Sequence, residues 1–338
     1  MTQGNNPTAA APRAPWGPGK IDVHHHFIPD FYRKAMDDAG IGNPGGMPLP
    51  NFTPLGLIER FDKLGIGAAI MSLSTPGVYF GDAAFAIDLA RRCNEYAAEL
   101  TAAHNSRIGF FGTVPSPLAQ ASVAEAVYSL DVLKADGICL LASTDGVFVG
   151  DARYEELMAV LNQRDCVVFI HPHLHPASVD IAVNAPKFLL EFVFDTTRAA
   201  LNLAMNGVLD RYPRIRWILA HAGGTVPYLQ YRVAWMDYRM PQVPDTFRQV
   251  REQVPGGISA ALRKFYYDTA LSTAAAPMAA LRSFVEPSQI LFGSDGTYVH
   301  DAGIQMEIDA LGDAHVMPAE LEQAVSRENA LALFPRFG

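Results

Sequence analysis

The sequence predicts an α/β fold, a (β/α)8 TIM barrel with a mononuclear metal site at the C-terminal ends of its strands. Two observations point to this fold. Short apolar runs alternate with amphipathic stretches along the 338 residues, which is typical of strands and helices that alternate around a barrel. Several of these runs also stop at a side chain of a metal-ligand type. The predicted strands are Ile21–His26, Ala68–Leu73, Ile108–Val114, Gly137–Leu141, Val167–His171, Trp217–His221, Phe265–Thr269 and Ile290–Ser294.

Each predicted strand is short and largely apolar, as expected for parallel strands whose two faces are both covered. The stretches between them carry apolar residues at helical spacing and predict an outer layer of helices. Two connections, residues 27–55 after the first strand and 172–197 after the fifth, are long enough to serve as lids or walls of a site. The predicted helices are Asp82–His104, Ala119–Lys134, Tyr154–Gln163, Thr225–Tyr238, Pro244–Arg263 and a last helix at Ser326–Phe334.

The chain divides into two predicted parts. Residues 1–19 are rich in Pro, Ala and Gly and predict a flexible N-terminal arm, and residues 20–338 predict a single barrel domain. Apolar residues make up 49% and charged residues 18%, which is enough for a large core. Lys and Arg number 26 against 35 Asp and Glu, a net charge of −9 without any basic run. This balance argues against nucleic acid or an anionic membrane as a partner.

The three cysteines, Cys93, Cys139 and Cys166, stand in apolar surroundings. Their odd number and these surroundings predict reduced, buried thiols and a cytoplasmic protein. No segment resembles a signal peptide, and none has the roughly 18 apolar residues that suggest a membrane span.

Two histidines on the first predicted strand are the strongest sign of chemistry. Side chains alternate between the two faces of a strand, so His24 and His26 point the same way and His25 points toward the helix layer. A lone histidine is more often a hydrogen-bonded structural residue than a ligand. Two buried imidazoles on one face need a common reason to be there. Half of a metal site is therefore predicted at the end of this strand.

The other half lies far along the chain. His171, His221 and Asp295 fall at the ends of the fifth, sixth and eighth predicted strands. In a parallel barrel all these ends meet at one rim. A mixture of imidazole and carboxylate suits one divalent ion, with Zn²⁺ as the first expectation and Mn²⁺, Fe²⁺ or Co²⁺ as alternatives. No organic cofactor is predicted.

Longer motifs surround these residues, and together they resemble the amidohydrolase superfamily. The resemblance is to its decarboxylase-rich branch, which includes aminocarboxymuconate semialdehyde, γ-resorcylate and 6-methylsalicylate decarboxylases, and it runs from about Lys20 to Phe334. It implies that one metal is bound by His24, His26, His171 and Asp295, with His221 beside it as acid/base or substrate contact. The motifs are Asp22-Val-His-His-His-Phe, Leu73-Ser-Thr-Pro-Gly-Val, Phe169-Ile-His-Pro-His, Leu219-Ala-His-Ala-Gly-Gly-Thr-Val-Pro-Tyr, Tyr266-Tyr-Asp-Thr and Leu291-Phe-Gly-Ser-Asp.

A missing lysine sets the expected number of ions. Two-metal amidohydrolases usually bridge their ions with a carboxylated Lys that ends the fourth strand. Here that strand reads Gly137-Ile-Cys-Leu-Leu-Ala-Ser, and Lys134 stands before it, at the wrong end. Cys139 could be a soft ligand, but its apolar neighbours favour a core position. One metal is therefore expected.

Contacts to a substrate are less clearly marked. Arg232 matches, by the resemblance, an Arg that reaches the substrate carboxylate across a dimer interface, and an ordinary helix-surface Arg is the alternative. Phe52, Tyr79 and Phe80 could form an aromatic wall, and core packing is the alternative. The resemblance implies a homodimer or a dimer of dimers.

The resemblance implies a metal-dependent, non-oxidative carboxy-lyase that acts on a small hydroxylated aromatic acid. Within the branch, the stretch after Leu73 and the turn after His221 look most like 6-methylsalicylate decarboxylases. Asp295 would protonate the carboxylate-bearing ring carbon, and His221 would hydrogen-bond a substrate oxygen. The alternative is a hydrolase of a lactone, amide or related ring on the same site. A metal-binding structural or regulatory protein with an inactive barrel is a third hypothesis.

Overall fold

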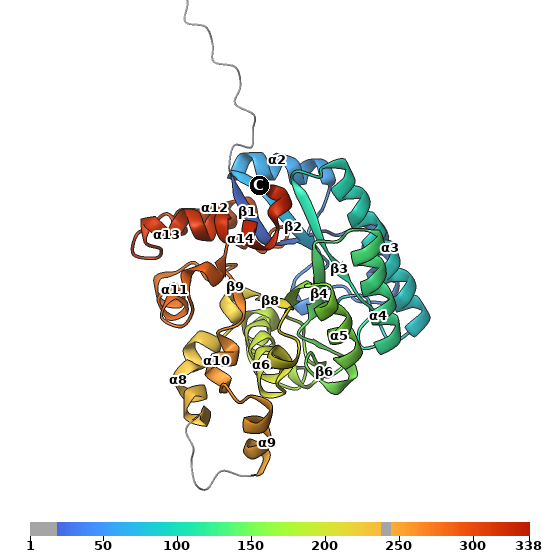
Figure 1. Cartoon of the computed structure of the whole chain (residues 1–338). Helices are drawn as coiled ribbons and strands as arrows, with labels where there is room; N and C mark the ends of the chain where they lie inside the picture. The colour runs from blue at the N-terminus through green and yellow to red at the C-terminus, as the bar shows by residue number, and fades with distance from the viewer. Residues whose placement is uncertain (1–18, 238–244) are drawn as a thin grey trace, which may run out of the picture.

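The structure, a computed structural model, describes residues 19–237 and 245–338, and eight parallel strands form its central sheet in the order β1-β2-β3-β4-β7-β8-β9-β10 (Figure 1). Val23 N donates to Phe292 O at 3.0 Å and His26 N donates to Gly296 O at 2.9 Å, which joins the first strand to the last. The predicted (β/α)8 barrel is therefore confirmed. Its strands are β1 Lys20–His26, β2 Ile66–Ser72, β3 Ile108–Thr113, β4 Gly137–Leu141, β7 Val167–His171, β8 Arg216–Leu219, β9 Tyr266–Asp268 and β10 Ile290–Leu291.

All eight predicted strands are present, but two of them end two or more residues before their predicted ends. β8 ends at Leu219 and β10 ends at Leu291, so His221 and Asp295 lie in the turns that follow. Both residues have left-handed backbones, with φ of 55° and 52°. A residue in that conformation cannot continue a strand, so the chain turns sharply and aims each side chain inward from the rim.

A bulge in β1 decides which side chains enter the barrel. The pairing of β1 with β2 shifts between Asp22 and His25. Val23 packs in the cluster of apolar residues inside the barrel, and the next residue, His24, contacts Phe169 of that cluster at a ring-centroid distance of 4.9 Å. One extra residue at a bulge lets two neighbours face the same side. Beyond the bulge the alternation resumes, and His26 joins His24.

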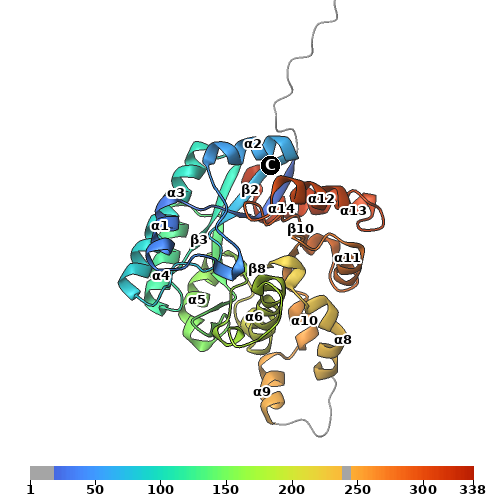
Figure 2. The same ribbon diagram turned by 180° about the vertical axis from the view of Figure 1, so that it is seen from behind.

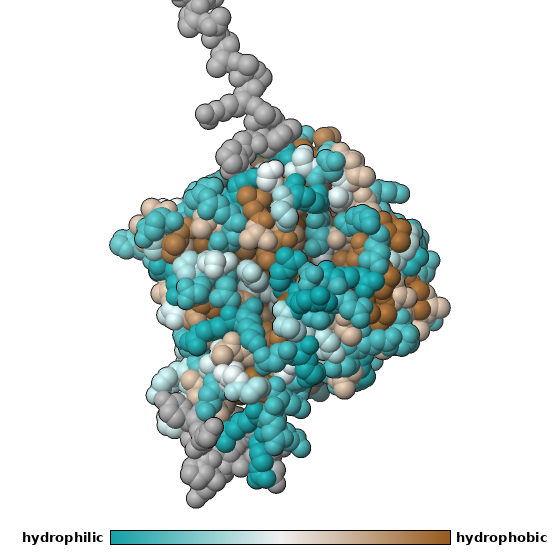
Figure 3. Space-filling model, in the orientation of Figure 1, coloured by the Kyte–Doolittle hydropathy of each residue, from teal (hydrophilic) through white to brown (hydrophobic). Residues whose placement is uncertain are grey.

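Helices lie around the outside of the sheet, as the views from both sides show (Figures 1 and 2). A second apolar cluster fills the layer between strands and helices. On the face in Figure 3, hydrophobic residues are interspersed with hydrophilic ones. The helices that match a predicted one are α3 Ala83–Ala103, α4 Ala119–Val127 with the π-turn η2 Tyr128–Val132, α5 Glu155–Gln163, α8 Val226–Asp237 and α14 Asn329–Leu333 with η8 Ala324–Glu328.

One predicted helix is wrong, because the structure divides its span into two helices. The expected span Pro244–Arg263 is divided into α9 Asp245–Gln253 and α10 Ile258–Leu262, and Pro244 lies outside the described residues. The break falls at Val254-Pro-Gly-Gly. Proline has no N–H for the helical hydrogen bond, and Gly257 takes a φ of 89°. α10 packs back against α8 and α6.

Both long connections contain helix that the sequence did not reveal. Residues 27–55 hold α1 Asp30–Asp38, η1 Pro44–Gly46 and the start of α2 Pro54–Leu64. Residues 172–197 hold η4 Pro176–Ser178, the π-turn η5 Phe188–Phe192 and the start of α6 Val193–Met205. The other elements are the hairpin β5 Ser143–Thr144 and β6 Val147–Phe148, η3 Ala152–Tyr154, α7 Val208–Arg211, η6 His221–Gly223, α11 Ala275–Arg282, η7 Pro287–Gln289, α12 Asp301–Leu311, α13 Ala319–Gln323 and η9 Pro335–Phe337.

Two further expectations bear on location. Cys93, Cys139 and Cys166 are free thiols and all are buried, as predicted. Among the described residues, no helix combines the length and the apolarity needed to cross a bilayer. The predicted N-terminal arm, apart from Gly19, lies outside the part of the chain that the structure describes.

Candidate metal centre

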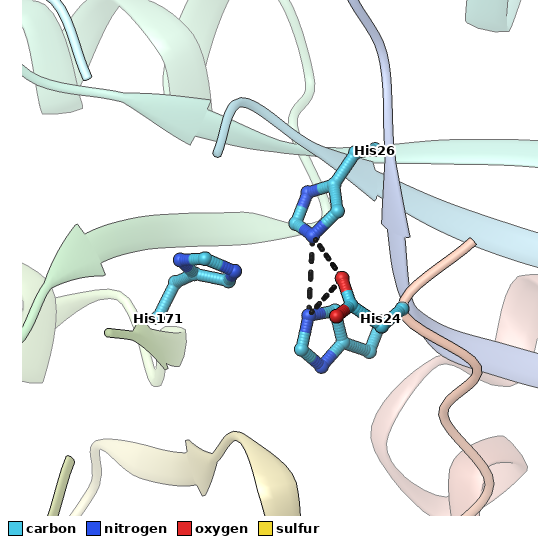
Figure 4. A group of neighbouring side chains, drawn as sticks. His24, His26 and His171 are labelled. Atoms are coloured by element: carbon cyan, nitrogen blue, oxygen red, sulfur yellow. Dashed lines mark hydrogen bonds and ion pairs between the residues drawn. The ribbon is translucent and has the colours of Figure 1, made fainter. Parts of the chain in front are cut away.

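Four side chains that are far apart in the sequence meet at the rim of the barrel. One donor atom of each lies within 4.8 Å of the others. His24 Nε2 lies 3.2 Å from His26 Nε2, and Asp295 Oδ1 lies 3.4 Å and 3.0 Å from these two nitrogens. Figure 4 shows the three imidazoles turned toward a common centre, with His171 opposite the pair from β1. We call His24, His26, His171 and Asp295 the four-donor cluster.

The other ring nitrogen of each histidine in the cluster is held by an oxygen. His24 Nδ1 lies 2.7 Å from Asp268 Oδ2, His26 Nδ1 lies 3.2 Å from Ser72 O, and His171 Nδ1 lies 2.8 Å from Pro172 O. A carbonyl or carboxylate oxygen accepts, so each Nδ1 carries the hydrogen. Each Nε2 can then direct its lone pair at a metal ion bound at the centre of the cluster.

The electrostatics of the cluster call for positive charge at its centre. Burial by itself would lower the pKa of His24, but the carboxylates of Asp268 and Asp295 raise it to about 10. Burial lowers the pKa of His26 and of His171, which therefore stay neutral. Burial would raise the pKa of Asp295, yet hydrogen bonds with His24 and His26 hold it well below its usual range.

The residues therefore fit a divalent ion. Three converging imidazole nitrogens and one carboxylate oxygen are a donor set for Zn²⁺ or a similar ion, which would take the place of the protons that His24 and His26 otherwise share with Asp295. Cys139 is buried and is not part of the cluster, and the strand β4 that carries it has no lysine. Lys134 is exposed and donates to Asp131 O.

Asp268 is a residue that the sequence reasoning missed. It ends β9, is fully buried and holds His24 through Oδ2. Its Oδ1 accepts from the backbone N–H groups of His221 and Ala270, at 2.8 Å and 3.1 Å. One carboxylate thus orients a donor of the cluster and the turn that carries His221. The available signal was the Tyr266-Tyr-Asp-Thr motif, in which an acidic residue ends an apolar strand.

A second buried carboxylate supports the cluster from the outer face of the barrel. His25 points toward the helix layer, as predicted, and meets the Phe61 ring edge-on at 5.3 Å. Its Nδ1 lies 2.8 Å from Asp22 Oδ2, and the Ser294 hydroxyl donates to the same oxygen at 2.5 Å. The neighbouring Gly296 packs on the His25 ring so closely that a Cβ there would overlap the ring. These contacts fix the turn on which Asp295 sits.

His221 stands beside the cluster without belonging to it. Its ring centroid lies 4.9 Å from that of His24, and its Nδ1 lies 3.2 Å from Ala270 O. The carbonyl fixes the hydrogen on Nδ1 and leaves Nε2 as an acceptor. Burial lowers the pKa of His221, so the ring is neutral at pH 7.

A cavity of about 730 Å³ opens over the cluster. His171, Asp295 and His221 line it, together with Tyr298 and Ser74. Both long connections contribute to its walls, as the sequence predicted: residues 27–55 supply Pro44 and Met47, and residues 172–197 supply an apolar wall. That wall is formed by Phe188, Leu189, Phe192 and Val193.

The predicted substrate contacts lie away from this cavity. Arg232 is exposed on α8, and Phe52 and Phe80 are half-buried against the core. Tyr79 lines a separate small pocket beside Cys139. None of the four is among the residues that line the cavity, and their contact with a substrate stays a prediction. His300 lies at the cavity wall and caps α12 by accepting from Gly303 N at Nδ1.

Comparisons with known proteins bear on this site. A family model described as amidohydrolase matches residues 21–336. A 6-methylsalicylic acid decarboxylase from Penicillium expansum and another from Aspergillus aculeatus are each 37% identical over 325 residues, covering 94% of this chain and 96% of theirs. The crystal structure of an amidohydrolase II protein superimposes with a TM-score of 0.85 at 27% identity, covering 94% of this chain and 99% of that one.

Proposed function

The chain belongs to the amidohydrolase family, and from that premise we propose that it is a metal-dependent, non-oxidative decarboxylase of a hydroxylated aromatic acid. A salicylate or 6-methylsalicylate type of substrate is the first candidate. The observation that carries the proposal is the four-donor cluster at the base of an apolar cavity. It occurs in a chain that matches two 6-methylsalicylic acid decarboxylases over nearly its whole length.

The chemistry must avoid a free aryl carbanion, so the ring carbon is protonated before CO2 leaves. An ortho hydroxyl makes this possible, because its ionised form pushes electrons into the ring. When bound at the four-donor cluster, a divalent ion supplies positive charge that orients and polarises the neighbouring phenolate and carboxylate oxygens. No lysine or arginine is among the described residues that line the cavity, so the acid group has no cationic side chain there to pair with.

Two residues of the chain move protons in this scheme. His221 Nε2, left free by the hydrogen bond from Nδ1 to Ala270 O, accepts the proton of the ortho hydroxyl. Asp295, which its low pKa leaves ionised in the free site, takes a proton from solvent and delivers it to the ring carbon that bears the carboxylate. The bond from that carbon to the carboxylate then breaks, its electron pair stays in the ring, CO2 leaves and aromaticity returns. His221 returns its proton to the phenolate oxygen of the product, and solvent reprotonates Asp295 for the next turnover.

The test uses the metal-loaded protein with salicylic and 6-methylsalicylic acids in D2O. We expect loss of CO2 and one deuterium at the vacated ring carbon, and no turnover of the O-methyl ether, which cannot form a phenolate. Asp295→Asn should be inactive while Asp309→Asn, an exposed position on α12, retains activity. Hydrolysis of a ring ester or amide with ¹⁸O from labelled water, and no CO2 from any hydroxybenzoate, would decide for the hydrolase instead.

We also propose that one ion is bound per subunit, with Zn²⁺ as the first candidate and Mn²⁺, Fe²⁺ and Co²⁺ as alternatives. The absence of a lysine from β4 supports a single ion. Elemental analysis should find close to one ion per chain in the native protein. His171→Ala should lose both metal and activity, and His315→Ala, an exposed histidine, should lose neither. Two tightly held ions per chain would contradict the proposal.

A dimer is the assembly we propose. α8 exposes Tyr228, Tyr231 and Trp235, which are 83%, 74% and 51% accessible, and this supports a contact surface on that helix. Arg232 lies among them and would reach the carboxylate of a substrate bound to the other subunit. Arg232→Ala should raise KM without changing metal content, whereas Arg214→Ala, just before the N-terminal end of β8, should leave KM unchanged. A fully active monomer in light scattering would refute both ideas.

The proposed location is the cytoplasm. The three cysteines support it, because all are buried free thiols and so suit a reducing compartment. Fractionation of cells that produce the full chain, followed by detection of the protein in each fraction, tests this proposal. Recovery from a secreted fraction would overturn it.

A further inference from the structure

We propose that the acid decarboxylated by this protein carries an extended apolar substituent, such as an alkyl chain of several carbons, on its hydroxylated benzoate ring. The inference rests on the proposed function and names the substrate class of the same site. It is drawn from the size of the cavity, from the chemistry of its walls and from the way one apolar side chain is held in it.

The cavity is larger than a simple salicylate requires. A cavity of about 150 Å³ holds benzene. A hydroxylated methylbenzoic acid has roughly twice as many non-hydrogen atoms and so needs on the order of 300 Å³ by the same measure. The cavity here measures about 730 Å³. More than half of it therefore stays unfilled when the ring and its acid group sit against the four-donor cluster.

One wall leads outward from the cluster along the π-turn η5. The His171 ring lies 6.3 Å from the Phe192 ring, and Phe192 lies 6.5 Å from Phe188. Both phenylalanines are half-buried, and the next residue, Leu189, is 56% exposed. π-turns occur often at functional sites, where they re-aim side chains. The wall thus runs from the metal donors to the surface as a continuous apolar track.

A second wall is also apolar and is held in place. Leu271, between β9 and α11, lines the cavity and is 58% exposed. Its backbone is left-handed, with φ of 51°, and its N–H donates to the buried Glu307 Oε1 at 2.7 Å. A large aliphatic side chain is unfavourable in that conformation, so the surrounding structure fixes it there. Ala276, Pro277 and Ala280 of α11 continue this wall.

Polar groups are few in the outer part of the cavity. Thr225, Ser272 and Tyr228 contribute hydroxyls, and His300 is engaged in capping α12. A charged or strongly polar substituent would lose its hydration there with little in return. An alkyl chain instead gains about threefold to fourfold in affinity for each methylene that it buries.

The test is a chain-length series of 2-hydroxy-6-alkylbenzoic acids and of their 4-alkyl isomers, from methyl through propyl and pentyl to heptyl, with salicylic acid as the unsubstituted member. We expect KM to fall by about threefold to fourfold per methylene up to at least pentyl in one series, with kcat nearly constant, because the chain binds equally in ground and transition states. Both series release 3-alkylphenols, whose binding is measured by calorimetry as a readout that needs no turnover.

A matched pair of variants locates the effect. Ala280→Phe fills the outer cavity and should abolish the gain per methylene, in both KM and phenol affinity. Ala279→Phe, one residue earlier on α11, exposed and outside the lining, should keep it. A KM that rises beyond methyl in both series, with phenol affinity that does not grow with chain length, overturns the inference. Failure of the proposed function looks different, because then no acid releases CO2 while the alkylphenols still bind in order of length.

Discussion

At the scale of single residues, the four-donor cluster depends on oxygens that bind the far side of its histidines. Each Nδ1 has a different partner: a carboxylate for His24, a strand carbonyl for His26 and the carbonyl of Pro172 for His171. The Ser72 hydroxyl also lies 3.1 Å from His26 Nδ1, but only His24 is supported by a carboxylate, the strongest of these acceptors. Asp268 is therefore the residue at which the support of a metal-binding histidine by a carboxylate can be tested.

Asp268→Asn should weaken metal binding by about 10-fold to 100-fold, the usual cost of losing a carboxylate behind a ligand histidine. The amide presents an N–H to His24 Nδ1 or to the backbone donors of His221 and Ala270, so one donor loses its acceptor. Competition with a chelator of known affinity measures the change. Asp309→Asn on the exposed side of α12 is the control. An unchanged affinity would show that Asp268 serves only the turn at His221.

Glu307 predicts a pH dependence of stability. Burial raises its pKa to about 9, against an ordinary value of 4.5 in the unfolded chain. The folded protein thus retains a proton that the unfolded chain releases. The contribution of this proton to the free energy of unfolding is complete below pH 4.5 and is lost as the pH rises toward 9. In metal-free protein, Glu307→Gln should match the parent near pH 5. It should then gain stability relative to the parent by up to about 1.4 kcal/mol per pH unit.

Urea unfolding of both proteins at pH 5.5, 7.0 and 8.5 measures this difference. The glutamine retains an oxygen that can accept from Leu271 N, so the loop should stay in place. Glu307→Ala removes that acceptor and should destabilise the protein at every pH. A difference between parent and Glu307→Gln that does not vary with pH would mean that Glu307 is ionised in the folded state.

Sequence reasoning located the four donors and His221 because each ends an apolar run, and the end of an apolar run can be recognised from the sequence alone. Asp268 also ends a strand, but its role depends on its side chain reaching His24 of β1 past the intervening β10, an arrangement set by barrel closure. Glu307 gave no signal, since an acidic residue inside a helix is ordinarily exposed. The aromatic residues chosen as a substrate wall follow a strand end in the chain, while the observed wall comes from residues 188–193 folded back over the rim.

At the scale of elements, the contact between β1 and the turn after β10 controls the position of Asp295. Gly296→Ala would place a methyl group against the His25 ring, which is buried and cannot move away. We expect a loss of about 1–3 kcal/mol in the free energy of unfolding together with weaker metal binding. Gly42→Ala is the matched control, because a Cβ there meets nothing within 4 Å. Destabilisation without any change in metal affinity would show that the packing of this turn does not control metal binding at the four-donor cluster.

The elements found by sequence and those missed differ in their local signals. α3 begins at Asp82, whose side chain caps the helix by accepting from Phe85 N at 2.7 Å, a recognisable start. α6 begins in the middle of a continuous turn from η5 and has no side-chain cap. α1 has just two buried residues, Tyr32 and Met36, so its apolar periodicity is too short to detect. The parallel strands were easier to find, since burial on both faces makes most of their residues apolar.

At the scale of the whole molecule, the metal should stabilise the fold. The cluster joins β1, β7 and the turn after β10, which are brought together only in the folded chain. Binding to the folded state alone adds about 4 kcal/mol when the free ion is at 1,000 times its Kd. Removal of metal should lower Tm by several degrees, and Zn²⁺ or Mn²⁺ should restore it. Calorimetry with and without a chelator measures the shift, and His171→Ala should show none.

The division of labour between strands and connections has a consequence for how such a protein can diverge. The donors that set the reaction are carried by strand ends and by turns locked to them. The walls that meet the rest of the ring are carried by residues 27–55, by residues 188–193 and by α11. Substitutions in the walls can therefore accumulate without disturbing the site of proton transfer. A lineage built on this barrel is free to exchange one aromatic acid for another while it inherits the same reaction unchanged.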